Sequence, residues 1–178
     1  MTLRGGDAPT DAPTEVPAGP VGPVGPVGAG KRVLVVNDTQ EILELFEELL
    51  TDLGFEVRLM SFAPRELDRV REAAPDIIIL DFVFGQRELL GWQLLQKIKM
   101  DRELDSIPVV VCTAAAREVG EQQGYLTEQG VIVVLKPFNV DQFEGAVVRA
   151  LTVSNSAAGL NRERTSELDR VPDRPTAD

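Results

Sequence analysis

Histidine is absent from all 178 residues of the chain, and this absence removes several kinds of chemistry. Ser-His-Asp and Cys-His nucleophiles need an imidazole as general base, and His-rich zinc sites need it as a ligand. Phosphohistidine cannot form on the chain either. Any phosphoryl group that the chain uses must therefore come from another molecule.

Cysteine, basic clusters and long apolar runs are equally scarce. The single cysteine, Cys112, lies inside an apolar run, so we expect no internal disulfide and a buried packing residue, as suits a reducing compartment. No run of about 18 apolar residues and no signal-peptide pattern occurs, which predicts a soluble, cytoplasmic protein without a membrane partner. The net charge of -11, without a basic stripe, argues against nucleic acid as a partner.

The two ends of the chain differ in composition from its middle. Residues 1–30 are mostly Pro, Gly, Ala, Thr and Val, with a short Gly-Pro-Val repeat, and residues 152–178 are polar without an apolar face. Such segments bury too little apolar surface to offset the entropy lost on ordering, so both are expected to be disordered tails. The folded unit is expected over residues 31–151.

Strand and helix patterns alternate five times within that unit. Apolar runs typical of buried strands occupy residues 33–36, 77–80, 109–112 and 131–135, whereas residues 55–59 alternate, as expected of an edge strand. Apolar residues recur at helical steps of three and four in four sets: Ile42, Phe46, Leu49, Leu53; Leu67, Val70, Ala74; Leu94, Leu95, Ile98; and Val140, Phe143, Val147, Leu151. The alternation predicts an α/β, flavodoxin-like, doubly wound (βα)5 fold with a five-stranded parallel sheet in the order 2-1-3-4-5.

The helix expected after residue 113 has the weakest apolar face of the series. Gln122 and Gln123 interrupt this face. Gly120 and Gly124 each cost about 1 kcal/mol relative to alanine in a helix interior. We therefore expect the least firmly held helix here, and a candidate for a moving part.

Asp38, Asp81, Thr113 and Lys136 each come just after one of the apolar strands. The carboxyl ends of parallel strands lie at one edge of a sheet, where open α/β folds bind ligands, so these side chains are expected to meet there. Two acids, a hydroxyl and a lysine suit a metal ion and a phosphoryl group. Taken singly, each has a simpler explanation. Asp38 could cap a helix together with Glu41, and Thr113 could be another cap. Lys136 could be a solvated strand end, and Asp81 could be an ordinary turn residue at the end of a strand.

Four segments, VLVVNDTQEIL, IIILDFVFGQRELLGWQLL, IPVVVCTAA and VVLKPF, occur in this order and resemble the receiver domain of two-component response regulators, in its stand-alone form. The resemblance implies that Asp81 is the phosphoacceptor, with Thr113 and Lys136 assisting. It implies Mg²⁺ as cofactor, held by Asp38, Asp81 and the backbone carbonyl of Val83. It also implies a phosphorelay in which a histidine kinase or phosphotransfer protein supplies the phosphoryl group. The protein would then be a signalling receiver rather than an enzyme, acting on a downstream protein partner.

Three features depart from the family pattern. Asn37 stands where a first acid is usual, so we expect weaker attraction of Mg²⁺ and, at most, a contact from Asn37 to the metal through water. The loop over residues 83–90 is about two residues longer than usual, so that Gly91 comes late. Val133 replaces the aromatic residue that switches in many receivers, so the signal is expected to pass through Thr113 and the helix after it.

The resemblance carries two further expectations. The bond between Lys136 and Pro137 is expected to be cis, which proline allows at low cost. Val83 and Ala115 occupy positions that influence how water reaches the acyl phosphate, and neither can orient a water by hydrogen bonding, which predicts slow self-dephosphorylation. Trp92, at the start of a helix, is expected to be a packing residue.

Two other functions stay open on the sequence. A degenerate receiver could bind a partner without phosphorylation, as the three departures would allow. An aspartate-nucleophile phosphatase of the haloacid dehalogenase type also uses Mg²⁺, Asp, Thr and Lys, but it needs a second Asp where this chain has Val83.

Overall fold

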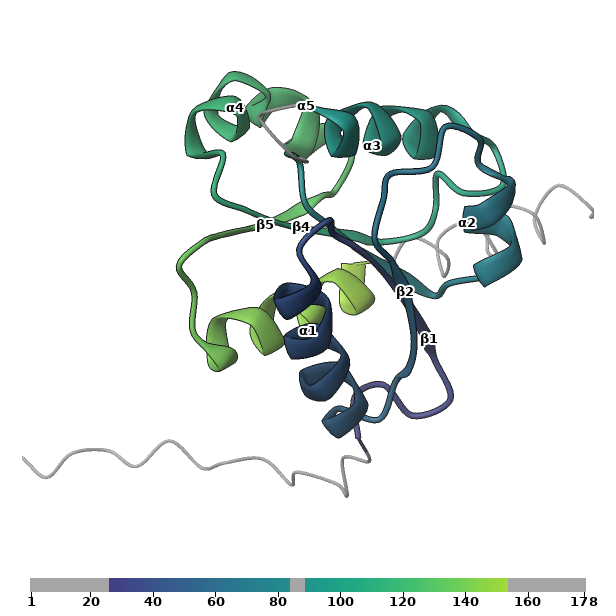
Figure 1. Cartoon of the computed structure of the whole chain (residues 1–178). Helices are drawn as coiled ribbons and strands as arrows, with labels where there is room; N and C mark the ends of the chain where they lie inside the picture. The colour runs from purple at the N-terminus through teal and green to yellow at the C-terminus, as the bar shows by residue number, and fades with distance from the viewer. Residues whose placement is uncertain (1–25, 84–88, 154–178) are drawn as a thin grey trace, which may run out of the picture.

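Five strands run parallel in one sheet: β1 (Arg32–Val36), β2 (Glu56–Met60), β3 (Ile77–Leu80), β4 (Val109–Thr113) and β5 (Ile132–Leu135). The structure, a computed structural model, describes residues 26–83 and 89–153 (Figure 1). The strand order is β2-β1-β3-β4-β5, which confirms the predicted flavodoxin-like order. β1 and β3 are therefore parallel neighbours, and the order in which strands are added to the sheet reverses between them.

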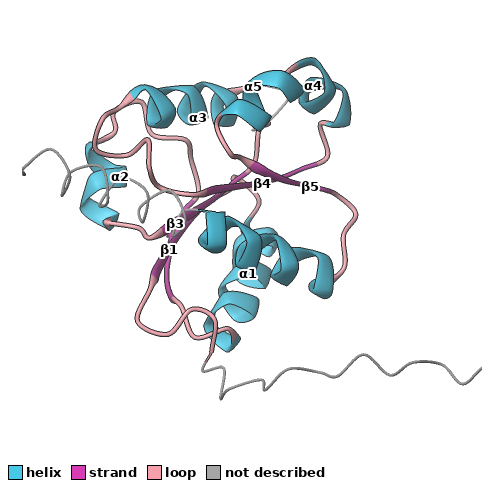
Figure 2. Ribbon diagram, turned by 180° about the vertical axis from the view of Figure 1, so that it is seen from behind, coloured by secondary structure: helices cyan, strands magenta, loops and turns pink. Residues whose placement is uncertain are grey.

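Helices cover both faces of the sheet (Figure 1, Figure 2). Their bounds are α1 (Gln40–Asp52), α2 (Asp68–Ala73), α3 (Leu90–Met100), α4 (Ala116–Glu121) and α5 (Gln123–Glu128), and residues 140–153 are also helical. α1 and the helical residues 140–153 pack on one face, and α2, α3, α4 and α5 pack on the other. Because side chains of a strand alternate between faces, Val33 and Val35 enter the first layer, whereas Leu34 and Val36 enter the second.

The continuous apolar runs are explained by this double coverage. Every residue of β3 and β4 is buried, and burial of each such aliphatic side chain stabilises the fold by about 1.5–3 kcal/mol. The expectation of full burial is wrong for β5. It is the second edge of the sheet, and Leu135 at its end is 44% exposed.

The predicted helix faces are close to the buried ones. In α1 the fully buried residues are Leu43, Phe46 and Leu50, so the predicted Ile42, Leu49 and Leu53 form the flank of that face. Two predicted core residues are wrong. Ala74 follows α2 with a φ of 42° and is exposed, and Val140 is 46% exposed at the start of the last helix.

The helix predicted after Thr113 is two short helices. α4 ends at Glu121 and α5 begins at Gln123, with Gln122 between them at φ -106° and ψ 8°. Val119 and Leu126 are the buried residues of the pair. Each helix thus contributes one buried anchor, in agreement with the weak apolar face of the sequence.

The folded part begins earlier than expected. Gly28 donates its backbone N–H to the carbonyl of Leu53 at 2.8 Å, and Val27 packs on the core layer of α1, so residues 26–30 belong to the fold. Residues 152 and 153 are helical as well. The predicted disorder of residues 1–25 and 154–178 lies outside the described residues.

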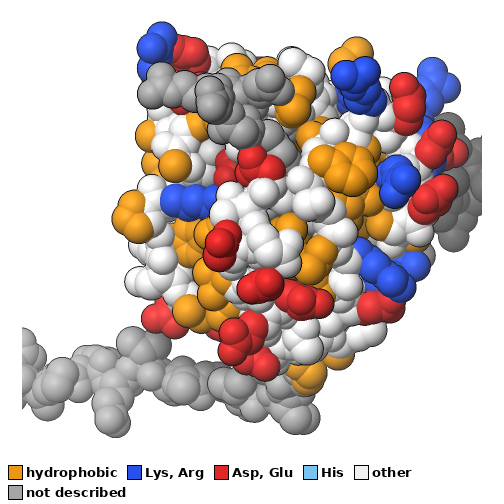
Figure 3. Space-filling model, viewed as in Figure 1, with side chains coloured by type: hydrophobic (Ala, Val, Ile, Leu, Met, Phe, Trp, Pro, Cys, Tyr) orange, Lys and Arg blue, Asp and Glu red, His pale blue; other side chains and the backbone are white. Residues whose placement is uncertain are grey.

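The surface over α1 is acidic. Its outward residues include Glu41, Glu44, Glu47, Glu48 and Asp52, and Figure 3 shows Asp and Glu side chains gathered on this side of the molecule. Among the described residues, no helix has the length and apolar composition needed to cross a membrane.

Candidate functional site

The sheet topology brings Asp81, Thr113 and Lys136 together at the carboxyl ends of β3, β4 and β5. Lys136 Nζ lies 2.7 Å from Asp81 Oδ2, and these side chains are only 22% and 12% exposed. The backbone N–H of Lys136 donates to the carbonyl of Thr113 at 2.9 Å, which ties the end of β5 to the end of β4. The Lys136–Pro137 bond is cis, as expected.

Asp38 follows β1 and completes the set, which we call the strand-end site (Asp38, Asp81, Thr113 and Lys136). An open cleft of about 670 Å³ is lined by Asp38, Asp81 and Thr113, together with Val83, Ala115 and Arg117. The two acids therefore border a common space, and Thr113 forms part of its wall.

The capping explanation of Asp38 is wrong. The residue before α1 is Thr39, and its side chain makes no capping hydrogen bond. The carboxylate of Asp38 is instead directed to the region of the cleft, where it accepts a hydrogen bond of 3.4 Å from Thr39 Oγ1. Thr113 is not a cap either, because Ala115 is the residue before α4.

Thr113 is fully buried, and its oxygen accepts the backbone N–H of Ala115 at 3.2 Å. This contact fixes the turn between β4 and α4. A hydroxyl can accept and donate at once, so the contact leaves its proton for an acceptor in the cleft.

Asn37 is the surprising member of the neighbourhood. It is 2% exposed, its Nδ2 donates to Asp81 Oδ2 at 3.3 Å, and its Oδ1 accepts the backbone N–H of Thr39 at 2.9 Å. The amide of Asn37 thus holds the carboxylate of Asp81 with one end and the start of α1 with the other. Its expected metal contact through water stays a prediction.

The sequence marks Gly91 only as a glycine that comes later in the loop after Asp81 than is usual. A Cβ at this position would lie 1.7 Å from the carbonyl oxygen of Asp81, so only glycine allows α3 to begin against this backbone. The signal in the sequence is the place of Gly91 between Asp81 and an apolar helix face. The expected lengthening of the loop falls mostly on residues 84–88, which lie outside the described residues.

The donor set at this edge fits Mg²⁺. Asp38 and Asp81 supply carboxylate oxygens, and the backbone N–H of Val83 donates to Asp81 Oδ1 at 3.3 Å, which places Val83 beside them. The metal contact from the Val83 carbonyl stays a prediction. Within the described ranges no group of three or more His, Cys, Asp or Glu could hold a metal ion. Two carboxylates are sufficient for Mg²⁺, which keeps several waters when bound to proteins.

Cys112 lies in β4 next to Thr113, but it is suited to packing alone. Burial raises the pKa of its thiol to about 12. Because the thiolate is the reactive form, this cysteine is inert near neutral pH.

Comparisons with known proteins find relatives over most of the folded part of the chain. The family model of the response regulator receiver domain matches residues 33–148. Response regulator Rre1 of Synechocystis sp. is 31% identical over 140 residues, which are 78% of this chain and 59% of Rre1. The polar-differentiation response regulator DivK of Brucella ovis is 31% identical over 114 residues, which are 64% of this chain and 89% of DivK.

Solved structures show the same fold. The chemotaxis protein CheY4 of Vibrio cholerae aligns with a TM-score of 0.58 at 22% identity, over 67% of this chain and 98% of CheY4. NtrX from Brucella abortus aligns with a TM-score of 0.61 at 29% identity, over 81% of this chain and 31% of NtrX. The chain therefore corresponds to nearly all of some relatives and to a part of others.

Proposed function

The chain belongs to the response regulator receiver family, a family of signalling domains rather than enzymes, and on this premise we propose that Asp81 accepts a phosphoryl group. The observation that carries the proposal is the contact of 2.7 Å between Lys136 Nζ and Asp81 Oδ2 at the head of an open cleft. A carboxylate with a fixed counter-charge and access to solvent is what an acceptor needs.

In the proposed reaction an oxygen of Asp81 attacks the phosphorus of a phosphohistidine on a histidine kinase or phosphotransfer protein. The bond from phosphorus to the histidine nitrogen breaks, and an acyl phosphate forms. The ammonium of Lys136 stabilises charge on the phosphoryl oxygens, and the Thr113 hydroxyl donates to one of them. A bound Mg²⁺, held by Asp38, Asp81 and the Val83 carbonyl, would offset the repulsion between two anions.

We place this exchange in the cytoplasm, with a protein as the downstream partner. Among the described residues, neither Val83 nor Ala115 brings a polar side chain to the cleft, so the slow self-dephosphorylation expected from the sequence stays part of the proposal. The phosphatase alternative is wrong, because the family is one of signalling receivers.

The proposal is tested by incubation of the protein with Mg²⁺ and acetyl phosphate, followed by intact mass measurement. We expect the wild type to gain the mass of one phosphoryl group and Asp81→Asn to gain none. Asp141→Asn, which makes the same change on the exposed surface of the last helix, should behave as wild type. If the wild type takes up neither phosphoryl nor beryllofluoride and resembles Asp81→Asn, the degenerate receiver is the better description.

A further inference from the structure

Three aromatic rings form a continuous line from the acceptor strand to α5. Phe82 directly follows Asp81, Trp92 lies in α3 and Tyr125 lies in α5. The ring centroids of Phe82 and Trp92 are 5.5 Å apart at an interplanar angle of 71°, and those of Trp92 and Tyr125 are 5.2 Å apart at 76°. Both are edge-to-face contacts, a favourable geometry for aromatic pairs. We call these three residues the aromatic bridge.

One end of the bridge is fixed to the backbone of the acceptor. Phe82 is 1% exposed, and its carbonyl accepts the backbone N–H of Trp92 at 3.4 Å. One residue earlier, Gly91 leaves no space between α3 and the carbonyl of Asp81. A displacement of the backbone at Asp81 and Phe82 therefore has to displace the start of α3, and the Trp92 ring with it.

The other end lies on the helix pair α4 and α5, which is weakly held. α4 and α5 are separated at Gln122, and each has one buried residue. Alanine at Gly120 or Gly124 would meet no neighbouring atom within 4 Å, so the surroundings of both glycines are open. Figure 1 shows α5 between α4 and α3, with α4 above the carboxyl ends of β4 and β5.

We propose that Trp92 and Tyr125 are positioning residues, which act through Phe82 on the backbone of Asp81 and so link acceptor occupancy to the placement of α5. This inference rests on the proposed function. The bridge is a second route for the signal, besides the one expected through Thr113 and the helix after it. It also supplies an aromatic contact that Val133, at the usual position of the switching ring, cannot make. Linkage is reciprocal, so if occupancy of Asp81 changes the placement of α5, a variant at Tyr125 that favours one placement alters binding at Asp81.

The test uses the full chain, Mg²⁺ and beryllofluoride, with binding measured by ¹⁹F NMR and by the emission of Trp92, the only tryptophan of the chain. We expect beryllofluoride to change the Trp92 emission of the wild type. Tyr125→Leu removes one ring contact and should weaken beryllofluoride binding about three- to tenfold. Tyr125→Phe keeps the ring and should stay within about twofold of the wild type.

Phe62→Leu is the matched control, because Phe62 is an exposed ring outside the bridge, 6.0 Å from the guanidinium carbon of Arg69. It should bind as wild type. Thermal melting checks that each variant is folded, and Trp92→Leu, followed by ¹⁹F NMR, replaces Tyr125→Leu if that variant does not fold. It should also weaken binding.

The outcomes separate this inference from the proposed function. Wild type that binds beryllofluoride with unchanged Trp92 emission, and a Tyr125→Leu variant with wild-type affinity, would overturn the bridge and leave the acceptor role intact. An equal loss of affinity in Phe62→Leu would also overturn it. Wild type that binds no beryllofluoride would overturn the acceptor role, and the role of the bridge with it.

Discussion

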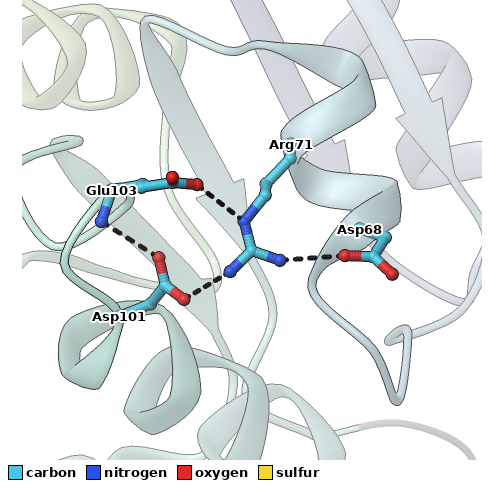
Figure 4. Close-up of polar contacts among 4 residues, drawn as sticks. All are labelled: Asp68, Arg71, Asp101 and Glu103. Carbon is cyan, nitrogen blue, oxygen red and sulfur yellow. Dashed lines mark hydrogen bonds and ion pairs between the residues drawn. The ribbon is translucent and has the colours of Figure 1, made fainter.

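The molecule contains two groups of charged side chains that are alike in composition and differ in geometry. The strand-end site has two carboxylates and one lysine. The second group, which we call the Arg71 cluster, has three carboxylates and one arginine: Asp68, Arg71, Asp101 and Glu103 (Figure 4). Both have an excess of acid, so net charge alone does not distinguish a site for chemistry from a structural contact.

Geometry distinguishes them. In the Arg71 cluster each guanidinium nitrogen has its own carboxylate: Nη1 lies 2.9 Å from Asp68, Nε lies 3.0 Å from Glu103, and Nη2 contacts Asp101. The cluster ties α2 to the chain that follows α3, near the amino ends of the strands. In the strand-end site, by contrast, the residues come from the carboxyl ends of different strands and face a cleft. A saturated cation is typical of a structural contact, and acids that line an open cleft are consistent with the proposed reaction.

The largest effect is expected from Gly91→Ala, which perturbs the backbone under the strand-end site. The new Cβ would overlap the backbone carbonyl of Asp81, so α3 or β3 must shift. We expect the free energy of unfolding to fall by about 3 kcal/mol or more, at the upper end of overpacking costs, and beryllofluoride binding to weaken with it. Urea denaturation and ¹⁹F NMR measure the two effects.

Gly145→Ala is the control for this change, because nothing lies within 4 Å of a Cβ at Gly145, in the helical residues 140–153. It should be neutral or stabilise by up to about 1 kcal/mol. If Gly91→Ala is as stable as Gly145→Ala, α3 does not begin in contact with the backbone carbonyl of Asp81.

Gly91 also illustrates what the sequence could and could not predict. The sheet order and the meeting of Asp38, Asp81, Thr113 and Lys136 could be predicted, because apolar runs define strands and parallel strands place their carboxyl ends together. The need for glycine at position 91 could not be predicted, because it depends on how closely a helix approaches a carbonyl across a loop. The aromatic bridge could not be predicted from the sequence for the same reason, since Trp92 and Tyr125 meet only through tertiary packing.

Asn37 marks another limit of the sequence. Because Asn37 replaces an acid, the sequence predicts weaker attraction of Mg²⁺. It does not reveal that the amide of Asn37 holds both Asp81 and the backbone of Thr39. The division of the helix after Thr113 at Gln122 was foreseen only as a weak face. Propensity indicates where a helix is weak, and the tertiary contacts decide where it breaks.

Asn37→Asp is expected to have the next largest effect, since it makes the strand-end site more acidic. The new carboxylate would replace an amide that donates to Asp81, so without Mg²⁺ we expect a loss of stability of about 2 kcal/mol from the like charges and the lost hydrogen bond. With Mg²⁺ the added acid should attract the cation and raise its affinity about tenfold. Thermal melting with increasing Mg²⁺ measures both effects.

The matched control is Asn139→Asp, at the start of the last helix. Asn139 Oδ1 accepts the backbone N–H of Gln142 at 2.8 Å, and aspartate is an equally good cap, so this variant should be as stable as wild type with no change in its response to Mg²⁺. A Mg²⁺ response of Asn37→Asp no larger than that of Asn139→Asp would place the metal away from Asn37.

The smallest effect, and the one that tests the comparison most directly, is expected from Arg71→Ala. Removing the guanidinium leaves Asp101, whose side chain is 19% exposed, beside Glu103 without their shared cation, so the melting temperature should fall by less than in Gly91→Ala. The difference from wild type should shrink at high salt, because screening weakens both the lost attraction and the new repulsion. Arg117→Ala, which removes only an exposed pair with Glu121, should not change the melting temperature measurably.

Beryllofluoride binding should be unchanged in Arg71→Ala, since a saturated cluster at the opposite end of the sheet has no free group to offer a ligand. A loss of that binding would mean that the two clusters are coupled, and that the Arg71 cluster is more than a structural tie.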